Sequence, residues 1–250
     1  MARSSLETLV SMIDATATAS DLEQLREEAH SEMEKIFYRH EGLASDKWHH
    51  YLAIYDRYLS RYRGTPARLL EIGVQNGGSL EIWRRYLGVE ARLQGLDIDP
   101  RCALLPVDAE ITIGDQGDPQ VLGELAAGDK PLDIVIDDGG HRWADQIQSF
   151  TMLFPHLASD GVYICEDIHT SYVDLFGDRA AGDLTFVEYV KRLIDGLHVQ
   201  YRTEACDVSS DLASTIRGIH VHDSIVVIEK GSPLVSRRVI TGQTRLVTGL

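Results

Sequence analysis

The chain has 250 residues and a formal net charge of −15, and 44% of its residues are hydrophobic and 25% charged. These values are ordinary for a globular protein with one large core, and the excess of acidic residues argues against a nucleic-acid partner, whose phosphates would be repelled. The three cysteines are widely spaced, which argues against a zinc site or a disulfide framework. No apolar run is long enough to cross a bilayer and the N-terminus lacks the pattern of a secretory signal, so we expect no membrane partner and a cytoplasmic location.

The first part of the chain, residues 1–64, shows the apolar spacing of amphipathic helices. The spacing predicts one helix over residues 6–13, a second that starts at Ser20-Asp21 and continues to Ile36, and a third that opens with Ser45 or Asp46 as its cap. We expect these helices to form a cap that packs on the main domain, with a subunit contact as the less favoured alternative.

From residue 65 the pattern changes to alternating strands and helices, and this predicts a second unit over 65–231 with a tail over 232–250. The last two strands are separated by too few residues for a crossover helix, so they must form an antiparallel hairpin. The sequence therefore predicts an α/β fold, a Rossmann-like doubly wound seven-stranded sheet with a terminal antiparallel hairpin. The predicted strands are 68–72, 93–97, 109–113, 133–137, 162–165, 216–221 and 225–228.

Two of these strands end in carboxylates. The apolar, β-branched run 134–136 is followed by Asp137, Asp138 and His141, and the run 161–165 is followed by Glu166-Asp167. In an open α/β sheet, the ligand crevice lies outside the carboxyl ends of the strands, so two neighbouring strand ends would bring these side chains together. Four adjacent carboxylates repel one another, and a divalent cation with oxygen ligands would relieve that repulsion.

The turns after the first three strands suggest a nucleoside-containing cofactor. Gly73, Gly77 and Gly78 lie between the first strand and a helix, where glycines let the backbone approach a ligand closely. Their spacing is not that of a G-x-G-x-x-G fingerprint or a Walker loop, which disfavours a pyrophosphate cofactor. The second strand ends in an acidic Asp97, suited to the ribose hydroxyls, and the third in Asp115-Gln116.

Residues 45 to 230 resemble the class I S-adenosylmethionine-dependent methyltransferases. More narrowly, they are similar to the metal-dependent sugar O-methyltransferases of macrolide and other antibiotic pathways, a group related to cephalosporin hydroxylase-type proteins. The motifs that carry the resemblance are Ser45-Asp46-Lys47, Leu70–Val74, Gly95–Asp99, Gly114-Asp115-Gln116, Asp137–His141 and Glu166–Tyr172.

The resemblance implies S-adenosylmethionine as cofactor and assigns residues to it. Lys47 would pair with the cofactor carboxylate, with a surface lysine as an equally weighted alternative. Asp137 is counted with the cofactor residues, and its alternative is to cap the next helix or orient its neighbours. By the same resemblance, the methionyl side is lined by Glu71, Gly73 and Ser79, the ribose by Asp97 or Asp99, and the adenine by Asp115 and Gln116.

The resemblance also implies Mg²⁺ held by Asp138, Glu166 and Asp167, with His141 as the general base. A sugar hydroxyl is a weak acid, and a metal that binds it lowers its pKa, while histidine titrates near neutrality. An exposed loop histidine is the alternative for His141, and a plain helix cap the alternative for Glu166-Asp167.

The expected acceptor is the deoxysugar hydroxyl, rhamnose-like, of a glycosylated polyketide or similar small molecule. Trp143, His169 and Tyr172 are candidate acceptor contacts, although packing is the simpler role for Trp143, and the variable segments 169–183 and 207–215 are the expected acceptor loops. A phenol or catechol acceptor and a non-catalytic cofactor-binding accessory protein are the alternatives. The resemblance further implies a homo-oligomer, a dimer or higher.

Overall fold

The computed structural model describes residues 17–128, 130–198, 201, 210–231 and 238–242. Its centre is a seven-stranded sheet of order β3-β2-β1-β4-β5-β7-β6, in which β7 is antiparallel to both of its neighbours. The predicted fold class and the terminal hairpin are therefore confirmed. The strands are β1 (Arg68–Ile72), β2 (Arg92–Asp97), β3 (Glu110–Ile113), β4 (Leu132–Asp137), β5 (Leu157–Cys165), β6 (Ile216–His222) and β7 (Ile225–Lys230).

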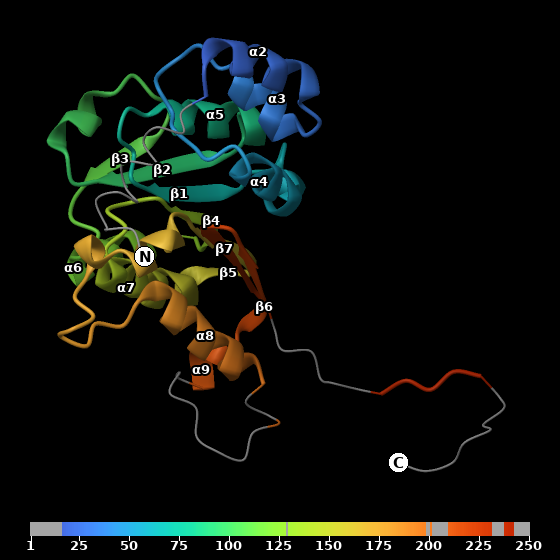
Figure 1. Ribbon diagram of the computed structural model, residues 1–250, viewed down its shortest axis with the longest axis vertical. Coiled ribbons are helices and arrows are strands. Elements are labelled where there is room, and N and C mark those ends of the chain that lie inside the picture. The colour runs from blue at the N-terminus through green and yellow to red at the C-terminus, as the bar shows by residue number, and fades with distance from the viewer. Residues whose placement is uncertain (1–16, 129, 199–200, 202–209, 232–237, 243–250) are drawn as a thin grey trace, which may run out of the picture.

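Helices cover both faces of the sheet (Figure 1). One face carries α2 to α5 and the other carries α6 to α9, as two separate hydrophobic clusters show. Among the described residues, no helix is long and apolar enough to cross a membrane. The helices are α2 (Ala19–Glu28), α3 (Glu32–Tyr38), α4 (Tyr51–Leu59), α5 (Gly78–Leu87), α6 (Pro119–Ala126), α7 (Trp143–Leu153), α8 (Phe186–Leu197) and α9 (Ser210–Ala213).

Strand β4 shows why the sheet must be covered on both sides. Ile134 and Ile136 pack into the cluster beneath α4 and α5, whereas Val135 packs into the cluster beneath α7 and α8, and all three are fully buried. Successive side chains of a strand point to opposite faces, so a continuous apolar run requires apolar neighbours on each face. Burying each of these side chains contributes roughly 1.5–3 kcal/mol.

The strand order brings the polar strand ends together. β4 lies beside β1 and β5, and the register pairs Ile72 with Asp137 and Asp137 with Cys165. The chain moves outward from β1 through β2 to β3 and then returns to the other side of β1, so β1 and β4 flank the point where the strand order reverses. Ligands of doubly wound sheets bind at this point, and the residues after β1, β4 and β5 all reach it.

The N-terminal helices differ from their prediction in three places. The second helix begins at Ala19, because Thr18 rather than Ser20 is the cap. It also ends at Glu28, and a new capping box formed by Ser31 and Glu34 starts α3, so the predicted continuous helix to Ile36 is wrong. The next helix begins at Tyr51, not at Ser45 or Asp46. The predicted helix over 6–13 lies outside the described residues, as does most of the 232–250 tail.

The segment before α4 packs closely on α5. Residues 43 and 44 cross directly over the first turn of α5, where a Cβ on Gly78 would lie 2.1 Å from the carbonyl oxygen of Leu43. Leu43 N–H donates to Glu81 Oε2 at 2.8 Å, which fastens the segment to α5.

Gly73 provides a test of the packing between β1 and β4. Its φ is +92°, and a Cβ there would lie 2.0 Å from the backbone oxygen of Asp138. We expect Gly73→Ala to lower the free energy of unfolding by at least about 2 kcal/mol, because both the left-handed backbone and the contact oppose a side chain. The measurement is urea denaturation.

The matched control is Gly123→Ala, in the interior of α6, where a Cβ meets nothing within 4 Å. There alanine should raise the free energy of unfolding by about 1 kcal/mol, since it is the better helix former. Equal stabilities of the two variants would contradict the proposed constraint at Gly73.

Candidate functional site

Asp97 at the end of β2 fixes the turn after β1 through hydrogen bonds. Its Oδ2 accepts the backbone N–H groups of Val74 (2.9 Å) and Gln75 (2.8 Å), and its Oδ1 accepts that of Asp99 (2.8 Å). Asp97 therefore shapes the glycine turn through its Oδ2 atom, a role that the sequence does not show. Asp99 lies at the surface and pairs with Arg101 instead.

Glu71 is fully buried beneath the same turn. Its Oε2 accepts from the hydroxyl of Ser79 at 2.7 Å, and its Oε1 accepts from the indole N–H of Trp83 at 3.1 Å. Burial raises the pKa of Glu71, while the nearby ammonium of Lys47 and these two hydrogen bonds oppose that rise. Glu71 and Ser79 thus lie together at the N-terminus of α5.

Gln116 and Asp137 form a buried pair behind the site. Gln116 Nε2 donates to Asp137 Oδ1 at 2.6 Å, and the hydroxyl of Tyr163 donates to Asp137 Oδ2 at 2.7 Å. Gln116 Oε1 accepts the backbone N–H of Gly140 at 3.1 Å. Gln116 therefore positions the turn after β4 and does not project toward a ligand, unlike its expected role beside adenine. Asp115 is exposed and accepts the N–H of Gly117.

These contacts and the burial of Asp137 act in opposite directions on its pKa. Burial raises its pKa to about 7, although the hydrogen bonds from Tyr163 and Gln116 lower it. Both carboxylate oxygens accept hydrogen bonds from protein groups and the side chain is buried, so Asp137 lies behind the crevice and faces neither the cofactor turn nor the other carboxylates.

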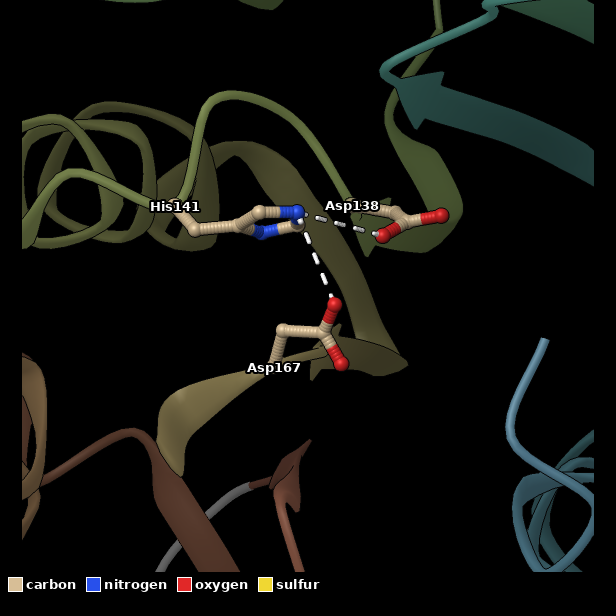
Figure 2. A group of neighbouring side chains, drawn as sticks. All are labelled: Asp138, His141 and Asp167. Atoms are coloured by element: carbon tan, nitrogen blue, oxygen red, sulfur yellow. Dashed lines mark ion pairs between the residues drawn. The ribbon is translucent and has the colours of Figure 1, made fainter. Parts of the chain in front are cut away.

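Asp138, His141 and Asp167 form the cluster at the ends of β4 and β5 (Figure 2). His141 Nε2 lies 3.6 Å from Asp167 Oδ2 and 3.9 Å from Asp138 Oδ1. One ligand atom of each residue lies within 4.8 Å of the others, a spacing that suits a metal ion. The Nδ1 atom of His141 is buried and has no hydrogen-bond partner among the described residues, so its other nitrogen is the one that faces the carboxylates.

Glu166 points in another direction, toward the N-terminal segment. Lys47 Nζ lies 2.9 Å from Glu166 Oε2 and 3.2 Å from Oε1, and it also contacts Asp138 Oδ2. The hydroxyl of Tyr55 donates to Glu166 Oε1 at 2.6 Å. Burial raises the pKa of Glu166, and so does the charge of Asp138, whereas Lys47 and Tyr55 lower it. Sequence reasoning placed Lys47 at the cofactor; in this structure its ammonium lies among the site carboxylates and is buried.

Two further side chains of the N-terminal segment hold Asp167. The indole N–H of Trp48 donates to Asp167 Oδ1 at 3.1 Å, and the hydroxyl of Tyr51 donates to the same oxygen at 2.8 Å. Tyr51 and Tyr55 are buried, and their hydroxyl groups reach the site. Lys47, Tyr51 and Tyr55 recur every four residues, and that spacing was the available signal that they share a face.

The remaining candidates lie beyond Asp167. Tyr172 is 70% exposed and available to a ligand, whereas Trp143 is fully buried, so an acceptor cannot reach Trp143. The Trp143 indole donates to the carbonyl of Thr170 at 2.8 Å, and the Thr170 hydroxyl donates to the carbonyls of Asp167 and His141. His169 is half-buried beside Trp48 and its Nδ1 contacts the Ser224 hydroxyl at the hairpin tip.

Asp137 gives a pH-dependent prediction. A carboxyl whose pKa rises from about 4 in the unfolded chain to about 7 in the folded one stabilises the fold at low pH, and that contribution is lost as the pH rises to 7 and above. Between about pH 5 and pH 8, we expect the unfolding free energy of Asp137→Asn to improve relative to wild type by roughly 2 kcal/mol. Urea denaturation at the two pH values measures this, with the exposed Asp118→Asn as the charge control. If the difference in unfolding free energy between Asp137→Asn and wild type were the same at both pH values, the raised pKa of Asp137 would be contradicted.

Comparison with known proteins shows which family the chain belongs to. No family model matches the chain. It is 36% identical over 197 residues to 8-demethyl-8-alpha-L-rhamnosyl tetracenomycin-C 2'-O-methyltransferase of Streptomyces olivaceus, with 74% of this chain and 52% of that protein covered. It is 38% identical over 199 residues to demethylmacrocin O-methyltransferase of Streptomyces fradiae, with 74% and 50% covered.

A solved structure matches as well. The MycE methyltransferase from the mycinamycin biosynthetic pathway, in complex with Mg and SAH, aligns with a TM-score of 0.68 at 32% identity, over 85% of this chain and 55% of that one. The chain spans about half the length of the curated relatives it matches. The chain is thus a protein of the class I methyltransferase fold, homologous to the sugar O-methyltransferases of macrolide and tetracenomycin biosynthesis.

Proposed function

We propose that this protein transfers a methyl group from S-adenosylmethionine to a hydroxyl of a deoxysugar on a glycosylated polyketide or similar small molecule, with the help of Mg²⁺. The observation that carries the proposal is the cluster of Asp138, His141 and Asp167 beside the glycine turn of β1. The similarity to an 8-demethyl-8-alpha-L-rhamnosyl tetracenomycin-C 2'-O-methyltransferase and to an L-olivosyl-oleandolide 3-O-methyltransferase supports the acceptor class.

The cofactor would lie over the turn after β1. Gly73 has no side chain that would fill the space between the turn after β1 and the backbone after β4. Glu71 and Ser79 supply polar atoms at the N-terminus of α5. At the next strand, Asp97 and Asp99 present carboxylates to the ribose side, with Asp97 also fixing the turn. Asp137 and Gln116 support this cradle from behind, and we assign them a positioning role in place of direct cofactor contact.

The donor set fits Mg²⁺, which prefers oxygen ligands in an octahedral arrangement. Asp138 and Asp167 face one another across His141, and Glu166 follows directly on β5. We propose Asp138, Glu166 and Asp167 as the ligands. When bound, the metal would lower the pKa of the acceptor hydroxyl and hold it in place.

His141 is the proposed general base. Its Nε2 is the nitrogen that faces the site, 3.9 Å from Asp138 Oδ1 and 3.6 Å from Asp167 Oδ2. The left-handed backbone of His141, with φ of +55°, aims the imidazole back toward the strand end. The alternative role for His141 is that of a nitrogen ligand in the cluster, and the His141→Ala variant below separates the two roles.

The acceptor side is the segment that follows Asp167. Tyr172 and Leu175 are 70% and 73% exposed, and Phe176 packs its ring against that of His141 at 6.4 Å between centroids. Apolar and aromatic surface next to the proposed base suits the body of a glycosylated polyketide. We propose His169, which follows Asp167 closely, as a contact of the sugar.

Activity with a panel of acceptors tests this function. We expect methyl transfer from S-adenosylmethionine to rhamnosylated polyketides in the presence of Mg²⁺, and loss of that activity on complete chelation.

His141→Ala should lower kcat by about 10²- to 10⁴-fold and leave Mg²⁺ affinity near wild type, because a base acts in the transition state. A large loss of Mg²⁺ affinity in His141→Ala would identify it as a ligand instead. Methylation of catechols but of no glycoside would overturn the proposed acceptor class.

A second experiment tests how Asp167 is held. Tyr51→Phe removes one of the donors to Asp167 Oδ1 without opening a cavity, and we expect it to weaken Mg²⁺ binding about tenfold, since partners that orient a ligand typically matter by that much. Isothermal titration calorimetry of Mg²⁺ in the presence of S-adenosylhomocysteine measures the affinity.

The matched control is Tyr58→Phe on the same helix. The Tyr58 hydroxyl is buried and has no hydrogen-bond partner among the described residues, so its removal should leave Mg²⁺ affinity unchanged. Identical affinities for Tyr51→Phe and Tyr58→Phe would show that Tyr51 does not position Asp167 for the metal.

A further inference from the structure

Lys47 brings a positive charge to the carboxylates that the proposed metal requires. Its ammonium contacts Asp138 Oδ2, lies 2.9 Å from Glu166 Oε2 and lies 3.9 Å from Glu71 Oε1, and its side chain is 5% exposed. Three carboxylates thus surround one ammonium group, and opposite charges this close stabilise the charged form of the lysine.

The contacts of Lys47 occupy a particular set of oxygen atoms. Both oxygens of Glu166 accept hydrogen bonds from it, and Tyr55 binds one of these oxygens as well. Of the two Asp138 oxygens, Oδ2 contacts Lys47 and Oδ1 faces His141. With Lys47 in place, Asp138 still offers an oxygen to an ion beside His141, but Glu166 has both oxygens engaged.

A metal ion that uses Glu166 must therefore compete with the ammonium. Mg²⁺ binds its ligands at about 2.0–2.1 Å, closer than any hydrogen-bonded nitrogen, so the two cations cannot share the same carboxylate oxygens without strong repulsion. The segment that carries Lys47 is fastened at both ends, by Leu43 to Glu81 and by Trp48 to Asp167. Between these anchors, the flexible stem of Lys47 is the part that is free to move the charge.

We propose that Lys47 is a built-in counter-ion that a divalent metal displaces from Glu166 and Asp138 when it binds. The proposal rests on the proposed metal site and goes beyond it by assigning a competing occupant. The ammonium keeps the buried carboxylates paired before the metal arrives, and it sets the concentration of metal that the site needs.

The sign of the effect of Lys47 on metal affinity tests the proposal. Lys47→Met keeps the apolar stem and removes the charge, so we expect Mg²⁺ to bind at least about tenfold more tightly than to wild type. Calorimetric titration of Mg²⁺ into the full chain without cofactor, at about pH 8, measures this. Lys35→Met, which removes an exposed lysine of α3, is the control for net charge and should match wild type.

A weaker or unchanged affinity in Lys47→Met would overturn the proposal and make Lys47 a residue that merely holds the carboxylates in place. Asp138→Asn separates this failure from that of the proposed function. If wild type binds Mg²⁺, Asp138→Asn does not, and Lys47→Met binds no more tightly than wild type, only the counter-ion role fails. If neither wild type nor Lys47→Met binds Mg²⁺, the metal site and the counter-ion role fail together.

A second measurement covers the case in which Lys47→Met does not fold. Wild-type protein is treated with an amine-acetylating reagent with and without saturating Mg²⁺, and the modification of each lysine is followed by mass spectrometry. Displacement predicts that Mg²⁺ speeds the acetylation of Lys47 several-fold while Lys35 is unaffected. An unchanged or slower reaction at Lys47 would contradict displacement.

Discussion

The carboxylates gathered at the ends of β1, β4 and β5 impose the constraint that the surrounding structure satisfies. A buried carboxylate is stable only when it is paired or hydrogen-bonded, and each one here has partners of its own. Helices α4 and α5 therefore do more than cover apolar residues, because they also bring donors to the strand ends. The pairs are Glu71 with Ser79 and Trp83, Asp137 with Gln116 and Tyr163, Glu166 with Lys47 and Tyr55, and Asp167 with Trp48 and Tyr51.

The N-terminal segment contributes to this arrangement both through packing and through hydrogen bonds. Tyr51 and Tyr55 share one hydrophobic cluster with Leu69 of β1 and Leu93 of β2, so packing runs without interruption from the helices into the sheet. Their hydroxyl groups end at Asp167 and Glu166. An aromatic side chain with a polar tip can serve the core and the site at once, and this makes the segment part of the site and not a separate cap.

The sequence was sufficient for the sheet and for the meeting of the strand ends, but not for the direction of individual side chains. The apolar run of β4 and the short link before β7 leave few alternatives, and adjacent strand ends then bring Asp138 close to Asp167. Gln116 lies at the expected strand end, yet its amide turns inward, because Asp137 needs a donor that position in the chain does not reveal. The left-handed backbone at His141 and Asp167 is equally invisible to a pattern of residue types, since any one Asp or His adopts it only occasionally.

Those two backbone conformations point to how the cluster is kept in place. Non-glycine residues with positive φ persist only where their surroundings determine them, and here the surroundings include a single hydroxyl. Thr170 Oγ1 donates to the carbonyl of Asp167 at 2.7 Å and lies 3.3 Å from that of His141, while the carbonyl of Thr170 itself accepts from the buried indole of Trp143. The backbones of His141 and Asp167 are thus tied through a buried brace formed by Thr170 and Trp143. Trp143 contributes to the geometry of the site through this brace, because its buried indole holds Thr170 in place.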